Sequence, residues 1–346
     1  MNVNLLTEGG LLHVRDGMFE LITEKKKTPI SPVKIERILV STRMRLTSDV
    51  LVLALQHKID VLFMDHFGDP VGRLWQPVLG STTRIRKQQC LWSLDGRGLE
   101  QARAWLLEKL DGQAAFLQDL AKRRTAQAEL LREAAAGIAA AAAATAADDL
   151  REPGAAARLR GFEGSAGRCY FTVLAEVIPE AYRFEGRSRR PARDPFNAML
   201  NYGYGVLYGY VEKACLVAGL DPHLGFMHRD DYNQRSFVYD FIEPYRVEVG
   251  RCVVSLFTRK QVRRTMFTPI ANGFTLAREG KEVLITALHE VMRGQRRQGK
   301  RKVQLKHAVQ LAAHAFATDL LESAALEAEL PEDERAAERE AACWSG

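Results

Sequence analysis

Two carboxylates, Asp240 and Glu243, stand three residues apart in the segment YDFIEPYR. On a helix this spacing places both side chains on one face. Their oxygens could there bind a divalent cation such as Mg²⁺ or Mn²⁺. An aspartate followed three residues later by a glutamate, with a proline next, is equally typical of a helix start. The spacing alone therefore leaves a metal site and a helix cap open.

His228 and Glu163 are two further candidate ligands. His228 ends the segment LDPHLGFMH, where a structural histidine is the ordinary expectation, and an imidazole ligand would shift the preference towards Mn²⁺. Glu163 lies in GFEGSAGRCYF, whose small residues permit close approach of a neighbouring helix or a nucleic-acid backbone. A carboxylate at a helix start also complements the helix dipole. Both residues therefore have a structural explanation beside the chemical one.

Basic side chains crowd the segment RSRRPAR. Guanidinium groups bind phosphate in a bidentate manner, although a solvated loop is the plain alternative. Tyrosines of the following segment NYGYGVLYGY could stack on bases, but their helical spacing favours core packing for at least two of the four. The run from Arg293 to Lys302 adds further basic surface. The candidate phosphate contacts are Arg187, Arg189, Arg190, Arg193, Arg259 and Lys260.

The charge of the chain is unevenly distributed. The 346 residues carry a net charge of +6, but the segment from Glu322 to Gly346 holds eight acidic and two basic residues, a net charge of −6. The rest of the chain is therefore at +12. A basic body with an acidic tail fits an anionic partner, for which nucleic acid is the usual case.

Cysteine usage and hydropathy exclude several classes of protein. The five cysteines are scattered and form no CxxC pair, which argues against a disulfide framework and a structural zinc site. The N-terminus lacks the features of a signal peptide. No uncharged apolar run is long and hydrophobic enough to span a bilayer. We expect a cytoplasmic protein with no membrane partner.

The elements that position the candidate residues fall into two parts. Residues 1–85 alternate in hydropathy and predict a small sheet domain with one helix over SDVLVLALQHK; Asp16-Gly17 predicts a hairpin turn. From residue 86 the apolar residues follow helical spacing, which predicts a helical domain over 86–322. The Ala-rich stretch around Ala139 favours a helix, either as part of a helical hairpin or as a poorly packed surface element. The acidic segment 323–346 is expected to be disordered.

Five segments, in this order, resemble the CRISPR-associated (Cas) protein one family, the integrase of CRISPR adaptation. The resemblance covers nearly the whole chain. It implies an α+β fold with an N-terminal β-sandwich-like dimerisation domain and a larger all-α catalytic domain. The segments are GFEGSAGRCYF, RSRRPARDPFNAMLNYGYGVLY, AGLDPHLGFMH, YDFIEPYR and FTLAREGKEVLITALHEVM.

The resemblance also implies roles for individual residues. Matching the family's motifs makes Glu163, His228 and Glu243 the ligands of a Mg²⁺ or Mn²⁺ ion and Asp240 an assisting catalytic residue. Asp230 and Asp231 match no motif and are left out of the site. The family's usual pair of alanines is Ala166-Gly167 here, which should weaken the helix slightly.

The implied activity is that of a metal-dependent DNA endonuclease and integrase. Such an enzyme inserts short foreign DNA, the spacer, into the CRISPR array by transesterification from a 3′-hydroxyl. Implied partners are double-stranded DNA (spacer precursor and CRISPR repeat), a second copy of the chain, and a dimer of Cas protein two that bridges two such homodimers. Cas protein four is a further candidate partner. Two alternatives remain open: a metal-dependent repair nuclease acting on branched DNA, and a non-catalytic DNA-binding scaffold.

Overall fold

The computed structural model describes residues 2–24, 26–74, 82–229, 231–232, 234–298 and 301–329, without the side chains of residues 82, 297, 298, 301 and 325–329. Asp230 and most of the predicted acidic tail lie outside this part. The chain divides into two compact units. The first comprises Met1–Val78, Ser188–Gly209 and Arg259–Leu288, and the second comprises Leu79–Arg187, Tyr210–Thr258 and His289–Gly346. The predicted domain boundaries after residues 85 and 322 stay predictions.

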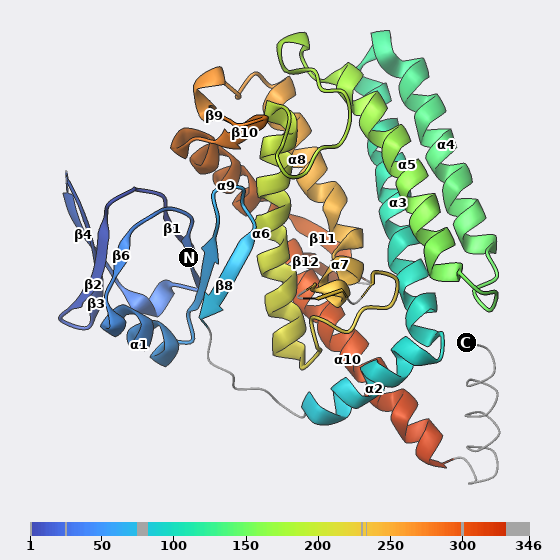
Figure 1. Cartoon of the computed structure of the whole chain (residues 1–346), viewed down its shortest axis with the longest axis horizontal. Helices are drawn as coiled ribbons and strands as arrows, with labels where there is room; N and C mark the ends of the chain where they lie inside the picture. Colours follow the sequence, from blue (N-terminus) through green and yellow to red (C-terminus); the bar gives the residue numbers. More distant parts are fainter. Residues whose placement is uncertain are drawn as a thin grey trace. The chain divides into compact units, whose positions relative to one another are not determined.

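The N-terminal part of the first unit is a pair of four-stranded sheets (Figure 1). Its elements are β1 (Asn2–Leu5), β2 (Leu11–Arg15), β3 (Met18–Thr23), β4 (Lys26–Ile30), β5 (Arg37–Val40), β6 (Arg45–Leu46), α1 (Ser48–Gln56), β7 (Asp60–Met64) and β8 (Pro70–Leu74). One sheet has the order β1-β5-β7-β8, in which only β8 is antiparallel to its neighbour. The other has the order β4-β3-β2-β6. The predicted sheet domain with one helix is confirmed.

Local sequence explains this arrangement. Asp16 and Gly17 adopt φ values of +51° and +72°, and these positive values form the two-residue turn whose twist matches paired strands. The turn sets the β2–β3 register, with Arg15 opposite Met18. Strand β5 reads RILV and is buried at all four positions, as expected of a strand covered on both faces.

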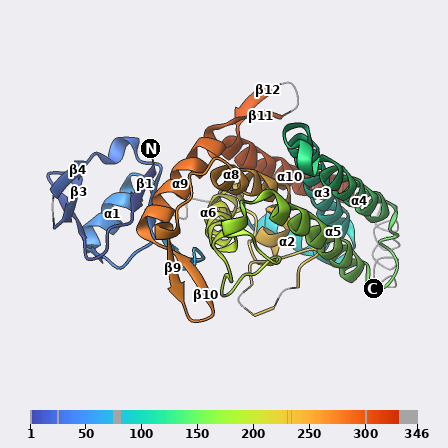
Figure 2. The same cartoon turned by 90° about the horizontal axis from the view of Figure 1, so that it is seen from above.

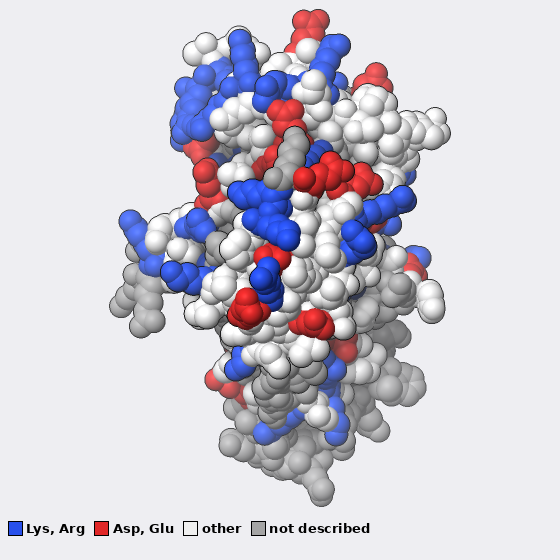
Figure 3. All heavy atoms as spheres, turned by 90° about the vertical axis from the view of Figure 1, so that its left-hand side faces the viewer, with Lys and Arg blue, Asp and Glu red and all other residues white. Residues whose placement is uncertain are grey.

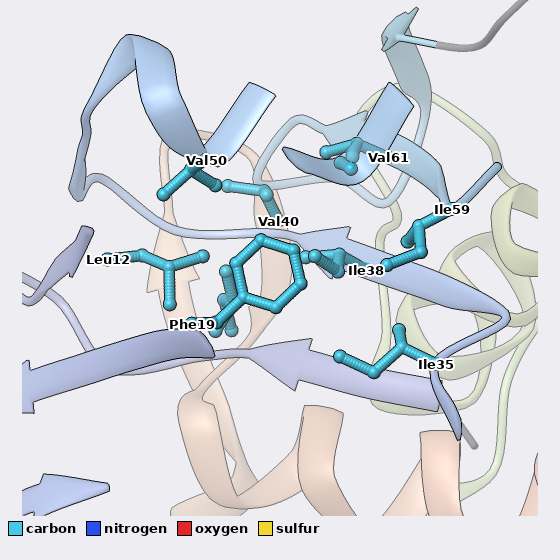
Figure 4. Packing of buried hydrophobic residues seen from close by; sticks show 10 residues of the cluster. Leu12, Phe19, Ile35, Ile38, Val40, Val50, Ile59 and Val61 are labelled. Atoms are coloured by element: carbon cyan, nitrogen blue, oxygen red, sulfur yellow. The ribbon is translucent and has the colours of Figure 1, made fainter. Parts of the chain in front are cut away.

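A hydrophobic cluster fills the space between the two sheets (Figure 4). Leu12 and Phe19 contribute from one sheet, Ile38 and Val40 from the other, and Val50 from α1. Phe19 is 1% exposed. Burial of such side chains contributes about 1.5 to 3 kcal/mol each. This core gives the N-terminal part its sandwich-like character.

Helix α6 (Pro195–Ala218) begins in the first unit, which also contains β9 (Phe267–Ile270), β10 (Gly273–Leu276) and most of α9 (Arg278–Arg293). Two glycines let α6 lie against the β7–β8 hairpin. A Cβ atom at Gly205 would lie 1.5 Å from the carbonyl oxygen of Gly68, and one at Gly209 would lie 2.4 Å from Leu62. Gly205 and Gly209 therefore serve packing.

The second unit is mainly helical. Its elements are α2 (Thr82–Leu94), α3 (Arg97–Arg123), α4 (Ala128–Ala147), α5 (Ala155–Val177), α7 (Ser236–Phe241), α8 (Arg246–Thr258), β11 (Gln295–Gln298), β12 (Arg301–Gln304) and α10 (Leu305–Glu329). Helices α3, α4 and α5 lie side by side (Figures 1 and 2). A short link joins α3 to α4, so the predicted helical hairpin is confirmed. The sequence did not predict the β9–β10 and β11–β12 hairpins.

One helical segment, Thr125–Ala147, is long and apolar enough to cross a membrane by the criteria of length and composition. No other helix in the described part of the chain meets these criteria. The segment contains α4, which packs against α3 and α5 within its own unit. A helix of a water-soluble bundle has the same composition, so this feature carries no assignment to a membrane.

Candidate metal centre

Glu163 projects from the middle of a long helix. Helix α5 begins at Ala155, eight residues before Glu163, and continues through Gly167 to Val177. The helix-start explanation of Glu163 is therefore wrong, because the helix dipole acts mainly within the first turn. A Cβ atom at Gly167 would have no neighbour within 4 Å, and one at Gly164 would only touch Arg168. Gly164 and Gly167 thus serve no close helix contact within the described structure, whereas Ala166 is buried.

Asp240 holds the loop that carries His228. The Asp240 side chain is fully buried. Its Oδ2 accepts hydrogen bonds from the backbone N–H groups of Phe226 (2.7 Å) and Met227 (3.0 Å). Its Oδ1 accepts one from the backbone of His228 (3.2 Å) and lies 2.6 Å from His228 Nδ1. One carboxylate thereby fixes both the backbone and the ring of the histidine.

Aromatic packing supports the same loop from the other side. The ring of Phe226 stacks on Trp105 of α3 and meets Phe237 of α7 edge-on, with centroid separations of 6.2 and 5.5 Å. A Cβ atom at Gly98 would lie 2.4 Å from the Phe226 ring, so glycine is needed there for close packing. Arg160, one helical turn before Glu163, donates a hydrogen bond to the Met227 carbonyl. The loop is therefore tied to both α3 and α5.

Glu243 follows α7 in a single 3₁₀ turn. Its Oε2 lies 2.5 Å from Lys109 Nζ, and its Oε1 lies 2.7 Å from Arg246 Nε. Lys109 Nζ also lies 2.7 Å from Glu163 Oε1. Glu163 and Glu243, here called the carboxylate pair, are thus joined by one ammonium group. The side-chain contacts of Asp240 and Glu243 go to the loop and to these cations, so the helix-cap interpretation is wrong.

The charges of this cluster perturb one another. Burial raises the pKa of Glu163. The Lys109 ammonium, and more weakly Arg246 and His228, lower it by more than burial raises it, so the pKa falls from its ordinary 4.5 to about 2. Burial also lowers the pKa of Lys109, whereas the negative charges of Glu243 and Glu163 raise it, with a net rise. Both members of the Lys109–Glu163 pair are therefore charged at neutral pH.

The donor set suits a hard divalent cation. The carboxylate pair offers oxygen atoms, and His228 offers Nε2, since its Nδ1 is engaged by Asp240. This is the pattern in which a second carboxylate orients a ligating histidine. Among the residues that the structure describes, no three Asp, Glu, His or Cys side chains are yet arranged to hold a metal. Lys109 Nζ contacts both carboxylates, so a cation already joins two of the three expected ligands.

Sequence reasoning missed Lys109 and Arg246. Lys109 lies in an otherwise apolar helical stripe with Leu106 and Leu110, both completely buried. A lysine at such a position is rarely buried unless it is paired with an acidic group. Its place in an apolar stripe could therefore have indicated a buried ion pair. Arg246 stands three residues after Glu243, a spacing at which helical side chains pair.

The candidate phosphate contacts lie on exposed segments. Arg189, Arg190, Arg193, Arg259 and Lys260 are exposed in the first unit, whereas Arg187 is half-buried in the second. Arg190 pairs with Asp69. On the face drawn in Figure 3, Lys and Arg side chains gather towards the top, with Asp and Glu among and below them.

The tyrosines that could have stacked on bases are partly excluded. Tyr202 is completely buried and Tyr204 is 8% exposed, so neither ring can meet a base without unfolding. Burial raises the pKa of Tyr202 to about 12. Tyr208 and Tyr210 are half-buried. The expectation that at least two of the four tyrosines belong to the core is confirmed.

The chain is similar in sequence to proteins of one family. The family model described as CRISPR associated protein Cas1 matches residues 3–290. The CRISPR-associated endonuclease Cas1 1 of Archaeoglobus fulgidus is 35% identical over 274 residues, covering 74% of this chain and 77% of the relative.

Solved structures show the same fold. A casposase bound to integration product superposes with a TM-score of 0.80 at 20% identity, covering 93% of this chain and 91% of that one. A Cas6-RT-Cas1–Cas2 complex gives a TM-score of 0.75 at 20% identity, covering 93% of this chain and 35% of that one. The predicted α+β fold is confirmed. The match of the family model and the identity to the Archaeoglobus relative together show that the chain belongs to the CRISPR-associated Cas1 family.

Proposed function

We propose that the chain is a divalent-metal-dependent DNA integrase of CRISPR adaptation, which joins short captured DNA to the CRISPR array. The observation that carries this proposal is the carboxylate pair, whose two members are joined by the Lys109 ammonium. Glu163, Glu243 and His228 would hold Mg²⁺ or Mn²⁺. When bound, the ion would supply Lewis-acid activation of a hydroxyl and stabilisation of charge at phosphorus.

The reaction is a transesterification. The 3′-hydroxyl oxygen of the captured DNA forms a bond to a phosphorus atom of the repeat, and the bond from that phosphorus to its 3′ oxygen breaks. The proton of the attacking hydroxyl is lost and the leaving oxygen gains one, so the number of phosphodiester bonds is unchanged. Asp240 would not bind the ion itself; its role is to fix the ring of His228 through Nδ1. With water as the nucleophile, the same site would hydrolyse DNA.

Binding of DNA is proposed to rest on the basic segments. Arg187, Arg189, Arg190, Arg193, Arg259 and Lys260 would neutralise phosphates, with affinity that falls steeply with salt and depends little on sequence. A Cβ atom would meet nothing within 4 Å at Gly167 and only the Arg168 side chain at Gly164. This room would let a phosphate backbone approach the carboxylate.

The partners follow from the family and remain proposals for this chain. They are double-stranded DNA, a second copy of the chain joined through the N-terminal domain, and a dimer of Cas protein two that bridges two such homodimers. The structural similarity to a Cas6-RT-Cas1–Cas2 complex supports the Cas protein two dimer as a partner. Cas protein four is a further candidate, and the cytoplasm is the proposed location.

Integration with a 3′-hydroxyl and with a 3′-blocked DNA tests the proposal. We expect joined product only with the free hydroxyl, in Mn²⁺, and a loss far above tenfold for His228→Ala. The matched control is His314→Ala, an exposed histidine on α10. Cleavage of the target with blocked DNA and no joining would favour the repair nuclease. DNA binding without Mn²⁺ binding or catalysis would favour the scaffold.

A further inference from the structure

Lys109 is a buried cation inside the candidate metal centre. Its side chain is 8% exposed and reaches from α3 to both members of the carboxylate pair, at 2.7 and 2.5 Å. Glu243 is 1% exposed. A carboxylate this deeply buried is strongly unfavourable without a counter-charge. Lys109 therefore supplies what the carboxylate pair needs when no metal ion is bound.

The charge count of the cluster is balanced without a metal. Two carboxylates face two cations, Lys109 and Arg246. Arg246 Nε lies 2.7 Å from Oε1 of Glu243, and Lys109 Nζ lies 2.5 Å from Oε2. A divalent ion between the carboxylates would lie against the Lys109 ammonium at very short range, where like charges repel strongly. Lys109, which contacts both carboxylates, would therefore have to move when the ion binds.

We propose that Lys109 is a displaceable counter-cation: it holds the carboxylate pair in the metal-free protein, leaves when the divalent ion binds, and is received by a DNA phosphate. This inference rests on the proposed function. The lysine side chain suits such a movement, since its ammonium is a compact charge with three donors on a flexible stem. The phosphate adds the negative charge that metal binding requires. Metal and DNA should therefore bind cooperatively.

The test is Mn²⁺ affinity, measured by calorimetry without DNA. The variants are Lys109→Met and Lys109→Gln; the amide of the second keeps donors for both carboxylates and so preserves the fold. The control is Lys122→Met on the same helix, where the lysine is 74% exposed and pairs with Asp119. We expect both Lys109 variants to bind Mn²⁺ at least tenfold more tightly than the wild type, and Lys122→Met to match the wild type.

The same titration in the presence of DNA bearing a 3′-hydroxyl tests the second step. DNA should tighten Mn²⁺ binding in the wild type by a larger factor than in Lys109→Gln, and by linkage Mn²⁺ should tighten DNA binding equally. Equal factors in the two proteins would overturn the transfer of Lys109 to phosphate.

The outcomes separate this inference from the proposed function. Unchanged or weaker Mn²⁺ binding by both Lys109 variants, with binding abolished by His228→Ala, overturns the role of Lys109 and leaves the metal centre standing. If no variant and no wild-type sample binds Mn²⁺, with or without DNA, the metal centre and the role of Lys109 both fail.

Discussion

Replacement of Asp240 with asparagine changes the group that holds the His228 loop while keeping its size. Asp240 accepts three backbone N–H bonds and contacts His228 Nδ1, all without exposure to solvent. Asparagine keeps one acceptor oxygen and places an amide nitrogen, a donor, where the second oxygen stood. Two donors of the loop then lose their acceptor and face another donor.

The magnitude follows from these contacts. A hydrogen bond to a charged group contributes about 1.5 to 3 kcal/mol, so loss of two costs about 3 to 6 kcal/mol. Relaxation of the loop between Phe226 and His228 brings the expected loss to the lower end. The His228 ring also loses the partner that fixes its orientation, so we expect Mn²⁺ affinity to fall by about tenfold or more.

Chemical denaturation measures the first effect and calorimetry the second. Hydrogen exchange at the amides of Phe226, Met227 and His228 gives a local readout, because these three donors are bonded to Asp240. The control is Asp231→Asn, an exposed residue of the same loop region, which should leave all three measurements unchanged. A variant Asp240→Asn with wild-type stability and wild-type exchange would refute the anchoring role.

Three further predictions concern α5 and the basic loop. Gly167→Ala should raise the free energy of unfolding by about 0.5 to 1 kcal/mol, because the added Cβ meets nothing; a loss of stability in denaturation would reveal an unseen neighbour. The folded-state pKa of Glu163 is about 2, below its ordinary 4.5, so ionised Glu163 contributes up to about 3 kcal/mol that is present above about pH 4.5 and lost as the pH falls towards 2. Denaturation across this range should show the stability difference between wild type and Glu163→Gln shrinking on acidification, and a constant difference would contradict the shift. Arg190→Ala should flatten the salt dependence of DNA binding by about one unit; an unchanged slope removes Arg190 from the interface.

Sequence patterns were most informative where neighbours in the chain decide the structure. The turn at Asp16-Gly17 was predictable because two residues with positive φ suffice to pair the adjoining strands. The expectation that at least two of the four tyrosines lie in the core was met by Tyr202 and Tyr204, although a spacing of two residues does not identify which tyrosines are buried. The helix that carries Glu163 begins at Ala155, directly after Pro153-Gly154, and its first six residues, AAARLR, are strong helix formers. The helix-start interpretation of Glu163 overlooked this signal.

Contacts between distant segments could not be predicted from local patterns. The spacing of Asp240 and Glu243 suggested a shared face, yet Asp240 serves the backbone around His228 and Glu243 serves two cations. The partner of Glu163 is Lys109, 54 residues earlier in the chain. No periodicity encodes such a pair, because it depends on how α3 and α5 pack.

Anomalous diffraction from Mn²⁺, in crystals of the protein grown with DNA bearing a 3′-hydroxyl, would locate the ion and its ligands. We expect one strong peak within bonding distance of Glu163, Glu243 and His228 Nε2, with the Lys109 ammonium turned away from the carboxylates. A peak elsewhere, or Lys109 still joining the carboxylate pair with no peak between them, would contradict this expectation.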